Sequence, residues 1–326
     1  MLAVIIKKFG GAEELILSEV PLPVPGPEQL LVKVHATGIN RADILQRKGK
    51  YPPPKGESEI LGLEIAGTVE TCGTNVKEFS KGQRVFGLVA GGGYAQYCSI
   101  DKHLAMTVPA QWSFEQAAAV PEVFFTANET VFELGELKKD EAILIHAAGS
   151  GVGTAAIQMA KSIGAHVYVT AGSNEKINQA KKLGAMAGIN YHETDFSEEL
   201  LRLTENQGVD VVEDFLGAKF FEKNISVLKK GGRLILVACM TGSRCELDIL
   251  QILQKRLQIK GFVMRQRSLQ EKAQICKRFQ GRWLTSLNSG KINPVIDSVY
   301  PLEQVREAHE LLESRKNFGK VVLGVS

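Results

Sequence analysis

One stretch near the middle of the chain decides the fold: His146-Ala147-Ala148-Gly149-Ser150-Gly151-Val152-Gly153-Thr154-Ala155-Ala156. The apolar segment 142–147 at its start predicts a strand, and the segment 152–163 predicts a helix. Small residues between a strand and a helix let the backbone approach a pyrophosphate closely, and the free N–H groups of the helix stabilise its charge. A tight turn without a ligand has the same sequence, but this context favours a dinucleotide-binding turn.

Strands and helices continue to alternate after this turn. A helix is predicted over 174–183, and further strands are predicted over 166–171, 209–215, 233–238 and 258–264. Strands that alternate with helices of about 10–15 residues are typical of βαβ crossovers and a buried parallel sheet. The pair Gly231-Gly232 fits a tight turn at the entrance of a strand. Five strands can be placed in this way, whereas a doubly wound sheet of the dinucleotide-binding type has six. We therefore expect an α/β domain with a doubly wound, six-stranded parallel sheet, one strand of which the pattern does not locate.

The first 121 residues differ from the rest in composition. Most of the prolines lie here, for example in segments 20–27 and 51–54, and short apolar stretches separate them. Glycine and proline at this spacing predict short strands and turns, as in a partly open β-barrel. The C-terminal part adds two predicted helices and a final strand, over 269–287, 302–314 and 320–325.

Composition excludes several classes of protein. With 39 Lys+Arg against 36 Asp+Glu and no block of like charges, nucleic acid is not an expected partner. No apolar stretch approaches the roughly 18 residues of a membrane span, and the segment 1–8 is not a secretory signal. Five scattered cysteines without a C-x-x-C argue against a disulfide framework and a four-thiolate zinc site. We expect a reduced, soluble, cytoplasmic protein.

The end of the second predicted strand indicates which dinucleotide binds. An NAD site offers a carboxylate there to the ribose 2′-hydroxyl, whereas an NADP site accepts a 2′-phosphate. This strand ends at Gly172 and Ser173, with Glu175 and Lys176 just beyond and no carboxylate at its tip. Lys176 offers a positive charge and Ser173 a hydroxyl donor, so the sequence favours NADPH. Alternatively, Lys176 is a solvated lysine in the first helical turn.

Other strand-end positions are expected to complete the cofactor groove, because ligands of open α/β sheets bind beyond the carboxyl ends of the strands. These positions are Leu216, Cys239, Val263 and Asn317. Cys239 is expected to pack there rather than to act as a nucleophile. Arg265 and Arg267 follow the last predicted strand and would face either the cleft or a domain boundary; the default reading is that both are solvated.

Five stretches together resemble a known family. They are Gly38-Ile39-Asn40-Arg41-Ala42-Asp43, Leu61-Gly62-Leu63-Glu64-Ile65-Ala66-Gly67, Gln116-Ala117-Ala118-Ala119-Val120-Pro121, the glycine-rich turn, and Asn317-Phe318-Gly319-Lys320-Val321-Val322-Leu323. The whole chain resembles the medium-chain dehydrogenase/reductase superfamily, and within it the zinc-free quinone oxidoreductases. The similarity is strongest to the tumour-suppressor-inducible quinone oxidoreductases of animals.

The resemblance implies a GroES-like catalytic domain and an inserted Rossmann domain, with the nicotinamide in the cleft between them. The catalytic domain would comprise residues 1–122 and be completed by 265–326, and the NADP-binding domain would comprise 123–264. The family forms homodimers through the edge of the Rossmann sheet. An edge strand over 258–264, with unpaired backbone groups, agrees with a homodimer.

The resemblance also implies that no metal is bound. In the alcohol dehydrogenase branch a Cys and a His hold the catalytic zinc, and Asn40 and Leu63 stand in those places here. An amide and a leucine cannot replace a thiolate and an imidazole as zinc ligands.

Site residues follow from the family by position. Asn40 and Tyr51 match residues that line the substrate end of the cleft; they could instead be a turn-capping Asn and a Tyr packed beside Pro52. Asp43 is expected to be a structural acceptor rather than an acid catalyst. The cofactor positions are Thr126 at the nicotinamide, Ser150, Gly151 and Val152 at the pyrophosphate, and Gly172, Ser173, Lys176 and Tyr191 at the 2′-phosphate and adenosine.

These features together predict an NADPH-dependent reductase of quinones or related α,β-unsaturated carbonyls. Without a metal, hydride transfer is easiest to an acceptor that is already electron-poor, with donors placed to stabilise the charge on its oxygen. Two alternatives stay open: an enoyl-thioester reductase of the same fold, and an NADPH-binding protein with little turnover, as in relatives that became lens crystallins.

Overall fold

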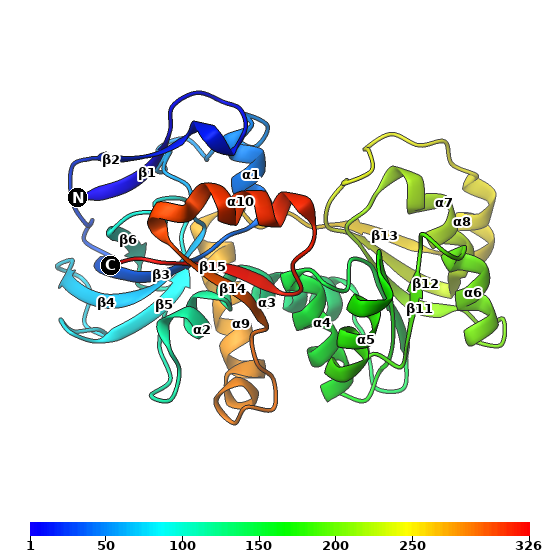
Figure 1. The fold of residues 1–326 in the computed structure, drawn as a ribbon. Coiled ribbons are helices and arrows are strands. Elements are labelled where there is room, and N and C mark those ends of the chain that lie inside the picture. The colour runs from blue at the N-terminus through cyan, green and yellow to red at the C-terminus, as the bar shows by residue number, and fades with distance from the viewer. The chain divides into compact units, whose positions relative to one another are not determined.

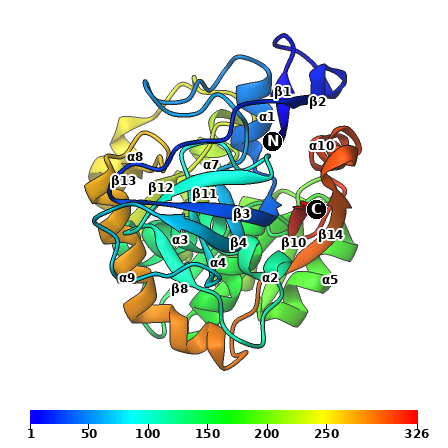
Figure 2. The ribbon, with the colours of Figure 1, turned by 90° about the vertical axis from the view of Figure 1, so that its left-hand side faces the viewer.

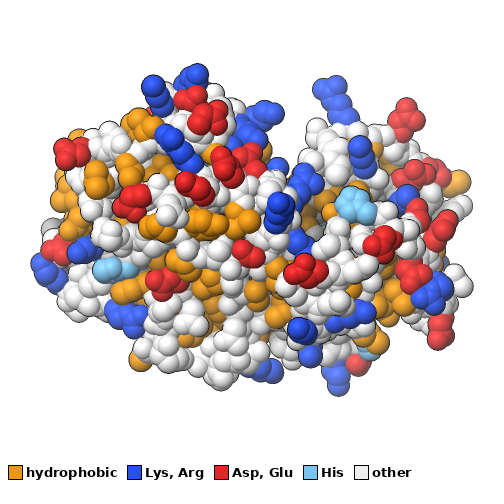
Figure 3. All heavy atoms as spheres, in the orientation of Figure 1, with side chains coloured by type: hydrophobic (Ala, Val, Ile, Leu, Met, Phe, Trp, Pro, Cys, Tyr) orange, Lys and Arg blue, Asp and Glu red, His pale blue; other side chains and the backbone are white.

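The computed structural model describes residues 1–326, and the chain divides into two compact units. The barrel unit comprises Met1–Phe125, Arg265–Leu284 and Pro294–Ser326, and the sheet unit comprises Thr126–Met264 and Thr285–Asn293. No helix combines the length and the apolar composition that a membrane span requires. On the face drawn in Figure 3, acidic and basic side chains are interspersed over each unit.

The sheet unit is built on one parallel sheet. Its strands are β8 (Ala142–Ile145), β9 (His166–Ala171), β10 (Ala187–Asn190), β11 (Val209–Asp214), β12 (Leu228–Leu236) and β13 (Gln258–Gly261). They lie in the order β10-β9-β8-β11-β12-β13, and every neighbouring pair is parallel. The chain winds outward from β8 in both directions, so the expected doubly wound, six-stranded sheet is confirmed.

Two sets of helices cover this sheet. The helices are α4 (Gly151–Ser162), α5 (Asn174–Leu183), α6 (Phe196–Leu203), α7 (Ala218–Val227) and α8 (Ile249–Lys255). Helices α4 and α5 contact each other, and α7 contacts both α6 and α8 (Figure 1). Local signals fix their ends: the Ser173 hydroxyl accepts the N–H of Lys176 at the start of α5, and Gly184, with φ of 124°, ends it.

The barrel unit is mainly antiparallel. Its strands are β1 (Leu2–Ile6), β2 (Leu15–Glu19), β3 (Gln29–Gly38), β4 (Glu64–Cys72), β5 (Arg84–Leu88), β6 (Tyr97–Asp101), β7 (Ala105–Thr107), β14 (Ile296–Pro301) and β15 (Lys320–Gly324). Seven of them form one sheet in the order β14-β15-β3-β4-β5-β7, with β6 also paired to β3. Because β15 pairs with β3, the C-terminal segment completes the sheet that the N-terminal segment begins.

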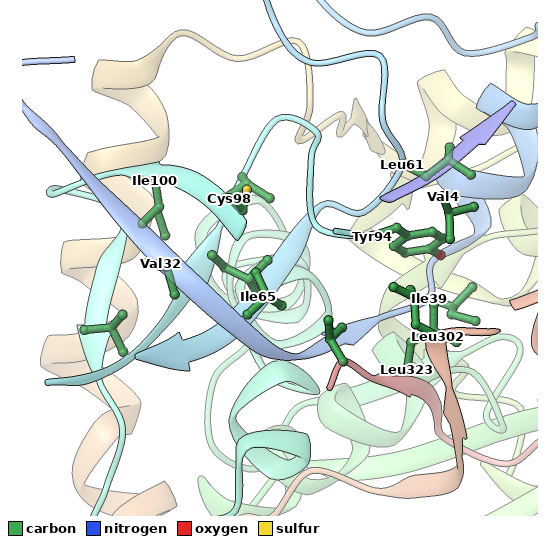
Figure 4. Packing of buried hydrophobic residues seen from close by; sticks show 14 of the residues in the cluster. Val4, Val32, Ile39, Leu61, Ile65, Tyr94, Cys98, Ile100, Leu302 and Leu323 are labelled. Carbon is green, nitrogen blue, oxygen red and sulfur yellow. The ribbon is translucent and has the colours of Figure 1, made fainter. Parts of the chain in front are cut away.

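Apolar side chains from both ends of the chain fill the barrel core. Figure 4 shows Val4, Ile39, Tyr94, Leu302 and Leu323 packed together, and each is at most 3% exposed. Burial of each aliphatic side chain contributes roughly 1.5–3 kcal/mol. The core therefore depends on residues that lie about 300 positions apart in the sequence.

Helices α1 (Arg41–Arg47), α2 (Phe114–Ala118), α3 (Pro121–Ala127), α9 (Leu269–Asn288) and α10 (Val305–Ser314) flank the barrel strands. In the barrel unit, α9 packs on α3 through Phe279, whose ring centroid lies 4.7 Å from that of Phe125. Figure 2 shows α9 as the long orange helix that runs from the left side to the bottom of the view. Helix α1 is fixed to α10 through the buried Arg47, whose guanidinium lies 3.2 Å from Nδ1 of His309. Burial lowers the pKa of His309 to about 3, so this ring is neutral and accepts the bond.

Three details differ from the sequence-based expectations. Strand β10 was not identified, because it has only four residues and includes Gly188. Strand β12 begins at Leu228 rather than 233: Gly231, with φ of 78°, lies in a bulge within the strand and not in a turn before it. Strand β13 ends at Gly261, because the ladder closes with the bond from the Phe262 N–H to Leu236 O.

Candidate functional site

The glycine-rich turn leaves β8 and opens helix α4. Ser150 is the N-cap: its hydroxyl accepts the N–H of Gly153 at 2.9 Å. The N–H groups of Gly151 and Val152 have no acceptor inside the helix, because the first turn of any helix lacks one. These groups and the positive end of α4 can hold a pyrophosphate. The Ser150 hydroxyl is used in the cap, so this residue shapes the turn in addition to any contact with phosphate.

The turn has no room for a side chain at Gly153. A Cβ there would lie 2.6 Å from Ala147 O and 3.1 Å from the Cα of Ala148. Ala147 itself is left-handed, with φ of 51°, and is held by the bond from the Ser150 N–H to its carbonyl. Helix α4 can therefore start this close to β8 only because residue 153 is glycine.

The end of β9 brings Gly172, Ser173 and Tyr191 together. A Cβ on Gly172 would lie 2.8 Å from the Tyr191 hydroxyl and 3.3 Å from Nε2 of His192. The Tyr191 ring also lies edge-on to Phe220 at 5.9 Å. A hydroxyl and an imidazole thus border the bare backbone of Gly172, together with the first turn of α5, which contains Lys176. His192 was missed by sequence reasoning, although it follows Tyr191 directly.

A carboxylate also lies near this strand end. Glu193 accepts bonds from the amides of Asn174 at 3.0 Å and Asn190 at 2.7 Å. Sequence reasoning considered only the tip of β9 and therefore missed this residue, which lies just after β10. Its bonds to two amides fix the carboxylate, and a test of the cofactor preference must take its charge into account.

Two further strand-end loops are bonded to each other. Asp214 ends β11 and accepts the N–H groups of Leu216 at 2.6 Å and Gly217 at 3.1 Å. Gly217, with φ of 78°, has no room for a Cβ, which would lie 2.9 Å from the Cα of Cys239. Leu216 is buried, so only its backbone can contribute to a groove, whereas Cys239 and Val263 are exposed.

Thr126 lies at the beginning of the sheet unit and is 5% exposed. Its carbonyl accepts the hydroxyl of Thr130 at 2.8 Å. That hydroxyl also lies 2.5 Å from Oε1 of Glu213, a buried carboxyl on β11. Burial raises the pKa of Glu213 to about 8. The residue expected to contact the nicotinamide is thus linked to a buried acid that sequence reasoning did not identify.

His146, next to the glycine-rich turn, is a satisfied core histidine. It is fully buried, with Nδ1 2.7 Å from the Thr170 hydroxyl and Nε2 2.7 Å from Oδ1 of Asn224. Burial lowers the pKa of its imidazole, which favours the neutral ring.

In the barrel unit, Asn40 precedes helix α1 and is 8% exposed. Its side-chain oxygen accepts a bond from Lys320 Nζ at 2.8 Å, and its Nδ2 donates to Oε1 of Glu64 at 2.8 Å. Lys320 Nζ also donates to Oε1 of Glu64 at 2.6 Å and to Ile39 O at 3.0 Å. Asn40 is therefore part of a buried polar cluster with one lysine and one glutamate.

The partners of Asn40 were missed by sequence reasoning, although both lie in the motifs that show the resemblance. Glu64 begins β4 and Lys320 begins β15, and each is flanked by apolar residues. Opposite charges within two buried strands were the available signal, because buried charges are almost always paired.

Asp43 has a structural role in the barrel unit. It is fully buried and accepts the N–H of Asn40 at 2.8 Å and that of Gly62 at 3.0 Å. Burial raises the pKa of Asp43 to about 6, although these two bonds oppose the shift. The carboxylate fixes the start of α1 and the chain before β4, as expected of an acceptor.

Tyr51 lies against Arg265. The guanidinium is 5.5 Å from the centre of the Tyr51 ring and donates to Tyr51 O at 3.2 Å and to Ala90 O at 2.9 Å. Arg265 is 4% exposed, so reading it as a solvated residue was wrong; its backbone partners and the ring replace water. Arg267 forms an ion pair with Glu271. Burial raises the pKa of Tyr51, which keeps its hydroxyl protonated as a donor.

Glu122 is a further acid in the barrel unit. Its backbone N–H donates to Oε2 of Glu64 at 2.8 Å, at the start of α3. Burial, followed by the charge of Glu64, raises the pKa of Glu122 to about 8. Asn317, in contrast, uses its side-chain amide to bond Gly319 O at 2.8 Å and is 6% exposed, so it shapes the turn before β15.

Asn40 and Leu63 stand at the positions where the alcohol dehydrogenase branch has its zinc ligands, and both have other contacts here. Asn40 is bonded to Lys320 and Glu64, and Leu63 is 2% exposed in the core. No group of three or more His, Cys, Asp and Glu side chains could hold a metal ion.

Comparison with known proteins gives the family. Residues 26–110 match the family described as alcohol dehydrogenase GroES-like domain, and residues 151–278 match the one described as zinc-binding dehydrogenase. The quinone oxidoreductase of Sus scrofa is 34% identical over 99% of this chain and 97% of its own length.

Solved structures agree over the full length. An NAD-dependent alcohol dehydrogenase has a TM-score of 0.89 at 34% identity, covering 100% of both chains. The quinone oxidoreductase of Escherichia coli complexed with NADPH has a TM-score of 0.89 at 32% identity, covering 99% of this chain and 100% of its own. The CurK enoyl reductase has a TM-score of 0.88 at 26% identity, covering 100% and 99%. The chain therefore belongs to the medium-chain dehydrogenase/reductase superfamily, as a full-length relative of the quinone oxidoreductases.

Proposed function

We propose that this chain is an NADPH-dependent quinone oxidoreductase that needs no zinc. The observation that carries the proposal is the glycine-rich turn, where a bare backbone and the capped start of α4 provide a pyrophosphate site. Full-length similarity to quinone oxidoreductases supports the type of reaction. In this proposal residues 1–122, completed by 265–326, form the catalytic domain, and 123–264 bind the cofactor.

The chain's own residues would then have distinct tasks. Gly151 and Val152 bind the pyrophosphate through their N–H groups, and Ser173, Lys176 and Tyr191 hold the 2′-phosphate end. Thr126, Leu216, Cys239, Val263 and Asn317 complete the groove, largely through backbone atoms where their side chains are buried.

Asn40 and Tyr51 are donors to the acceptor oxygen in this proposal. NADPH, when bound, supplies a hydride. A quinone that takes up this hydride and one proton becomes a hydroquinone, so negative charge develops on its oxygen during transfer. An amide N–H and a protonated phenol stabilise such charge without any metal.

An enoyl-thioester reductase is the second candidate, favoured by the structural similarity to the CurK enoyl reductase. The two candidates share the cofactor site and the hydride transfer, and they differ only in the acceptor. A direct comparison of acceptors therefore separates them.

The test is NADPH oxidation, followed at equal concentrations of an ortho-quinone, a simple enone and an enoyl thioester. We expect the fastest turnover with the quinone, and unchanged turnover after dialysis against a metal chelator. Turnover that prefers the thioester supports the second candidate. Tight NADPH binding without oxidation by any acceptor leaves a binding protein of low turnover, and stoichiometric zinc in the purified protein contradicts the metal-free proposal.

The cofactor preference predicts the effect of Lys176→Ala. Loss of one charge-assisted contact to the 2′-phosphate should raise the KM for NADPH by about 10-fold or more and that for NADH by about 2-fold at most. Glu193→Gln is the charge-reversed comparison: it removes a negative charge at the same strand end, so it should not raise the KM for NADPH. Steady-state kinetics with both cofactors measure this. Equal changes in the KM values for NADPH and NADH after Lys176→Ala would contradict a contact between this lysine and the 2′-phosphate.

We also propose a homodimer through the β13 edge of the sheet unit. Helix α8, which contacts β12, the neighbour of β13, exposes Ile249, Leu250 and Leu253 to 63%, 55% and 67%. Three adjacent exposed apolar side chains on a short helix are typical of an interface. Leu253→Asp should therefore give a monomer in light scattering, whereas Met186→Asp, at a residue of similar exposure (62%), should not. A wild-type monomer at micromolar concentration contradicts the proposal.

A further inference from the structure

The buried cluster around Asn40 has a chemical consequence for its amide. The ammonium group of Lys320 can only donate hydrogen bonds, so the atom of Asn40 that it contacts at 2.8 Å must be the oxygen. The ionised carboxylate of Glu64 can only accept them, so the atom that contacts it at 2.8 Å must be the nitrogen. The orientation of the amide is therefore fixed by the chemistry of its partners.

This arrangement leaves one N–H group of the Asn40 amide without a strong hydrogen-bond acceptor. Its oxygen is occupied by Lys320, and one of its two N–H groups is occupied by Glu64. The Nδ2 atom also lies 3.5 Å from Gly38 O, which is too long for a good hydrogen bond. A ligand oxygen can replace that contact, whereas a ligand donor finds no acceptor on Asn40.

The surroundings hold the cluster rigidly. Lys320 is 3% exposed and Glu64 is fully buried. All three donors of Lys320 are bonded, and the second oxygen of Glu64 accepts the backbone N–H of Glu122. A Cβ at Gly38 would lie 2.2 Å from Oε1 of Glu64, so the absence of a side chain there makes room for the pair.

A buried ion pair is not explained by stability alone, because desolvation of the two charges offsets most of their attraction. The desolvation cost of this ion pair therefore needs another reason. Both charged groups bond to the same residue, Asn40. We propose that Lys320 and Glu64 are positioning residues that hold the Asn40 amide as a donor toward the oxygen of the acceptor. This inference rests on the proposed function and deepens it: the site selects acceptors that present an oxygen lone pair, as carbonyls do.

The test uses a variant that avoids an unpaired buried charge. Lys320→Met combined with Glu64→Gln neutralises both residues at nearly constant volume, which is often tolerated by a fold. We expect kcat with a quinone to fall about 10- to 100-fold, with little change in KM or in the affinity for NADPH. This is less than the roughly 100- to 1000-fold lost when a preorganised donor is removed, because the variant releases the Asn40 amide and does not delete it. In the Asn40→Ala background the same double change should cost about 2-fold at most, because residues that act as a unit are not additive.

Two control variants accompany this comparison of the double change with and without Asn40. Lys320→Arg keeps the charge and should retain more activity than the neutral pair. Lys255→Met removes another partly buried lysine, which bonds Ile225 O and Ser226 O in the sheet unit, and should leave kcat unchanged. An equal loss of kcat with and without Asn40 would show that the pair is only structural, and no loss in either background would also overturn the proposal.

A second readout does not depend on turnover. With 15N-labelled asparagine, the side-chain N–H signals of Asn40, assigned by their loss in Asn40→Ala, should exchange slowly with solvent. Exchange should be at least about 10-fold faster in the neutral double variant, because the opening that precedes exchange becomes easier. Unchanged exchange overturns the positioning role even if the protein reduces no acceptor, whereas faster exchange in a protein without quinone turnover overturns only the proposed function.

Discussion

Replacing Gly153 by valine is expected to raise the dissociation constant for NADPH at least 100-fold, which corresponds to about 2.7 kcal/mol. The new Cβ would lie 2.6 Å from Ala147 O, a backbone atom that cannot rotate away. Helix α4 must then move from the end of β8, and the N–H groups of Gly151 and Val152 move with it. Fluorescence titration or calorimetry measures the affinity, and circular dichroism shows whether the protein is folded.

Gly281→Ala is the matched control for this prediction. Gly281 lies inside α9, and nothing lies within 4 Å of a Cβ built there. Alanine should leave the affinity unchanged and stabilise the protein by about 0.5–1 kcal/mol. A folded Gly153→Val variant that binds NADPH as tightly as the wild type would show that the turn is not the pyrophosphate site.

The second large effect concerns Glu213, whose buried carboxyl should make stability fall as pH rises. Burial raises its pKa from 4.5 to about 8. Below pH 4.5 both folded and unfolded states hold the proton, so the group costs nothing. Between pH 4.5 and 8 the unfolded state loses the proton while the folded state keeps it, so the free energy of unfolding decreases with pH. At about 1.4 kcal/mol per pH unit, the full cost approaches ~5 kcal/mol near pH 8.

Glu213→Gln should remove this dependence. Thr130 has one hydroxyl proton and two oxygens nearby, Thr126 O at 2.8 Å and Oε1 of Glu213 at 2.5 Å. A protonated Glu213 can donate to Thr130, and the amide N–H of glutamine can do the same. The other Glu213 oxygen has no hydrogen-bond partner, which makes the ionised form costly. The variant should therefore lie within about 1 kcal/mol of the wild type at pH 5 and exceed its stability by several kcal/mol at pH 8.

Denaturant midpoints followed by circular dichroism at pH 5, 6, 7 and 8 measure this difference. Asp195→Asn is the control: hydrogen bonds to Lys223 and Ser197 lower the pKa of Asp195 to about 2, so this group stays ionised throughout that range. Its substitution should shift all four midpoints alike. A constant gap between Glu213→Gln and wild type from pH 5 to 8 would show that Glu213 is already ionised.

The local signals in the sequence were enough to predict the sheet unit. Helix α5 was predicted over 174–183 and has those bounds, because Ser173 caps its start and Gly184 ends it. The errors fell where local signals are weak. Strand β10 is short, and a glycine with positive φ such as Gly231 occurs in bulges as well as in turns. Neither a four-residue strand nor a bulge has a periodicity of its own to detect.

The glycine-rich turn, which we propose as the cofactor site, could be located because all its parts lie within eleven consecutive residues. The cluster around Asn40 could not, because Glu64 and Lys320 lie 256 positions apart and meet only through the pairing of β15 with β3 and of β3 with β4. Arg265 was misread for the same reason, since its partners Tyr51 and Ala90 lie far away in the chain.

The sequence by itself determined the α/β class, the alternation of strands and helices, and the position of the glycine-rich turn. These features depend on contacts between residues a few positions apart, and hydrophobic periodicity, caps and glycines encode such contacts directly. Only the tertiary structure decided which charges are buried, which acids hold protons, and how the Asn40 amide is oriented. Those properties depend on desolvation and on partners from distant strands, and no local pattern in a single chain specifies them.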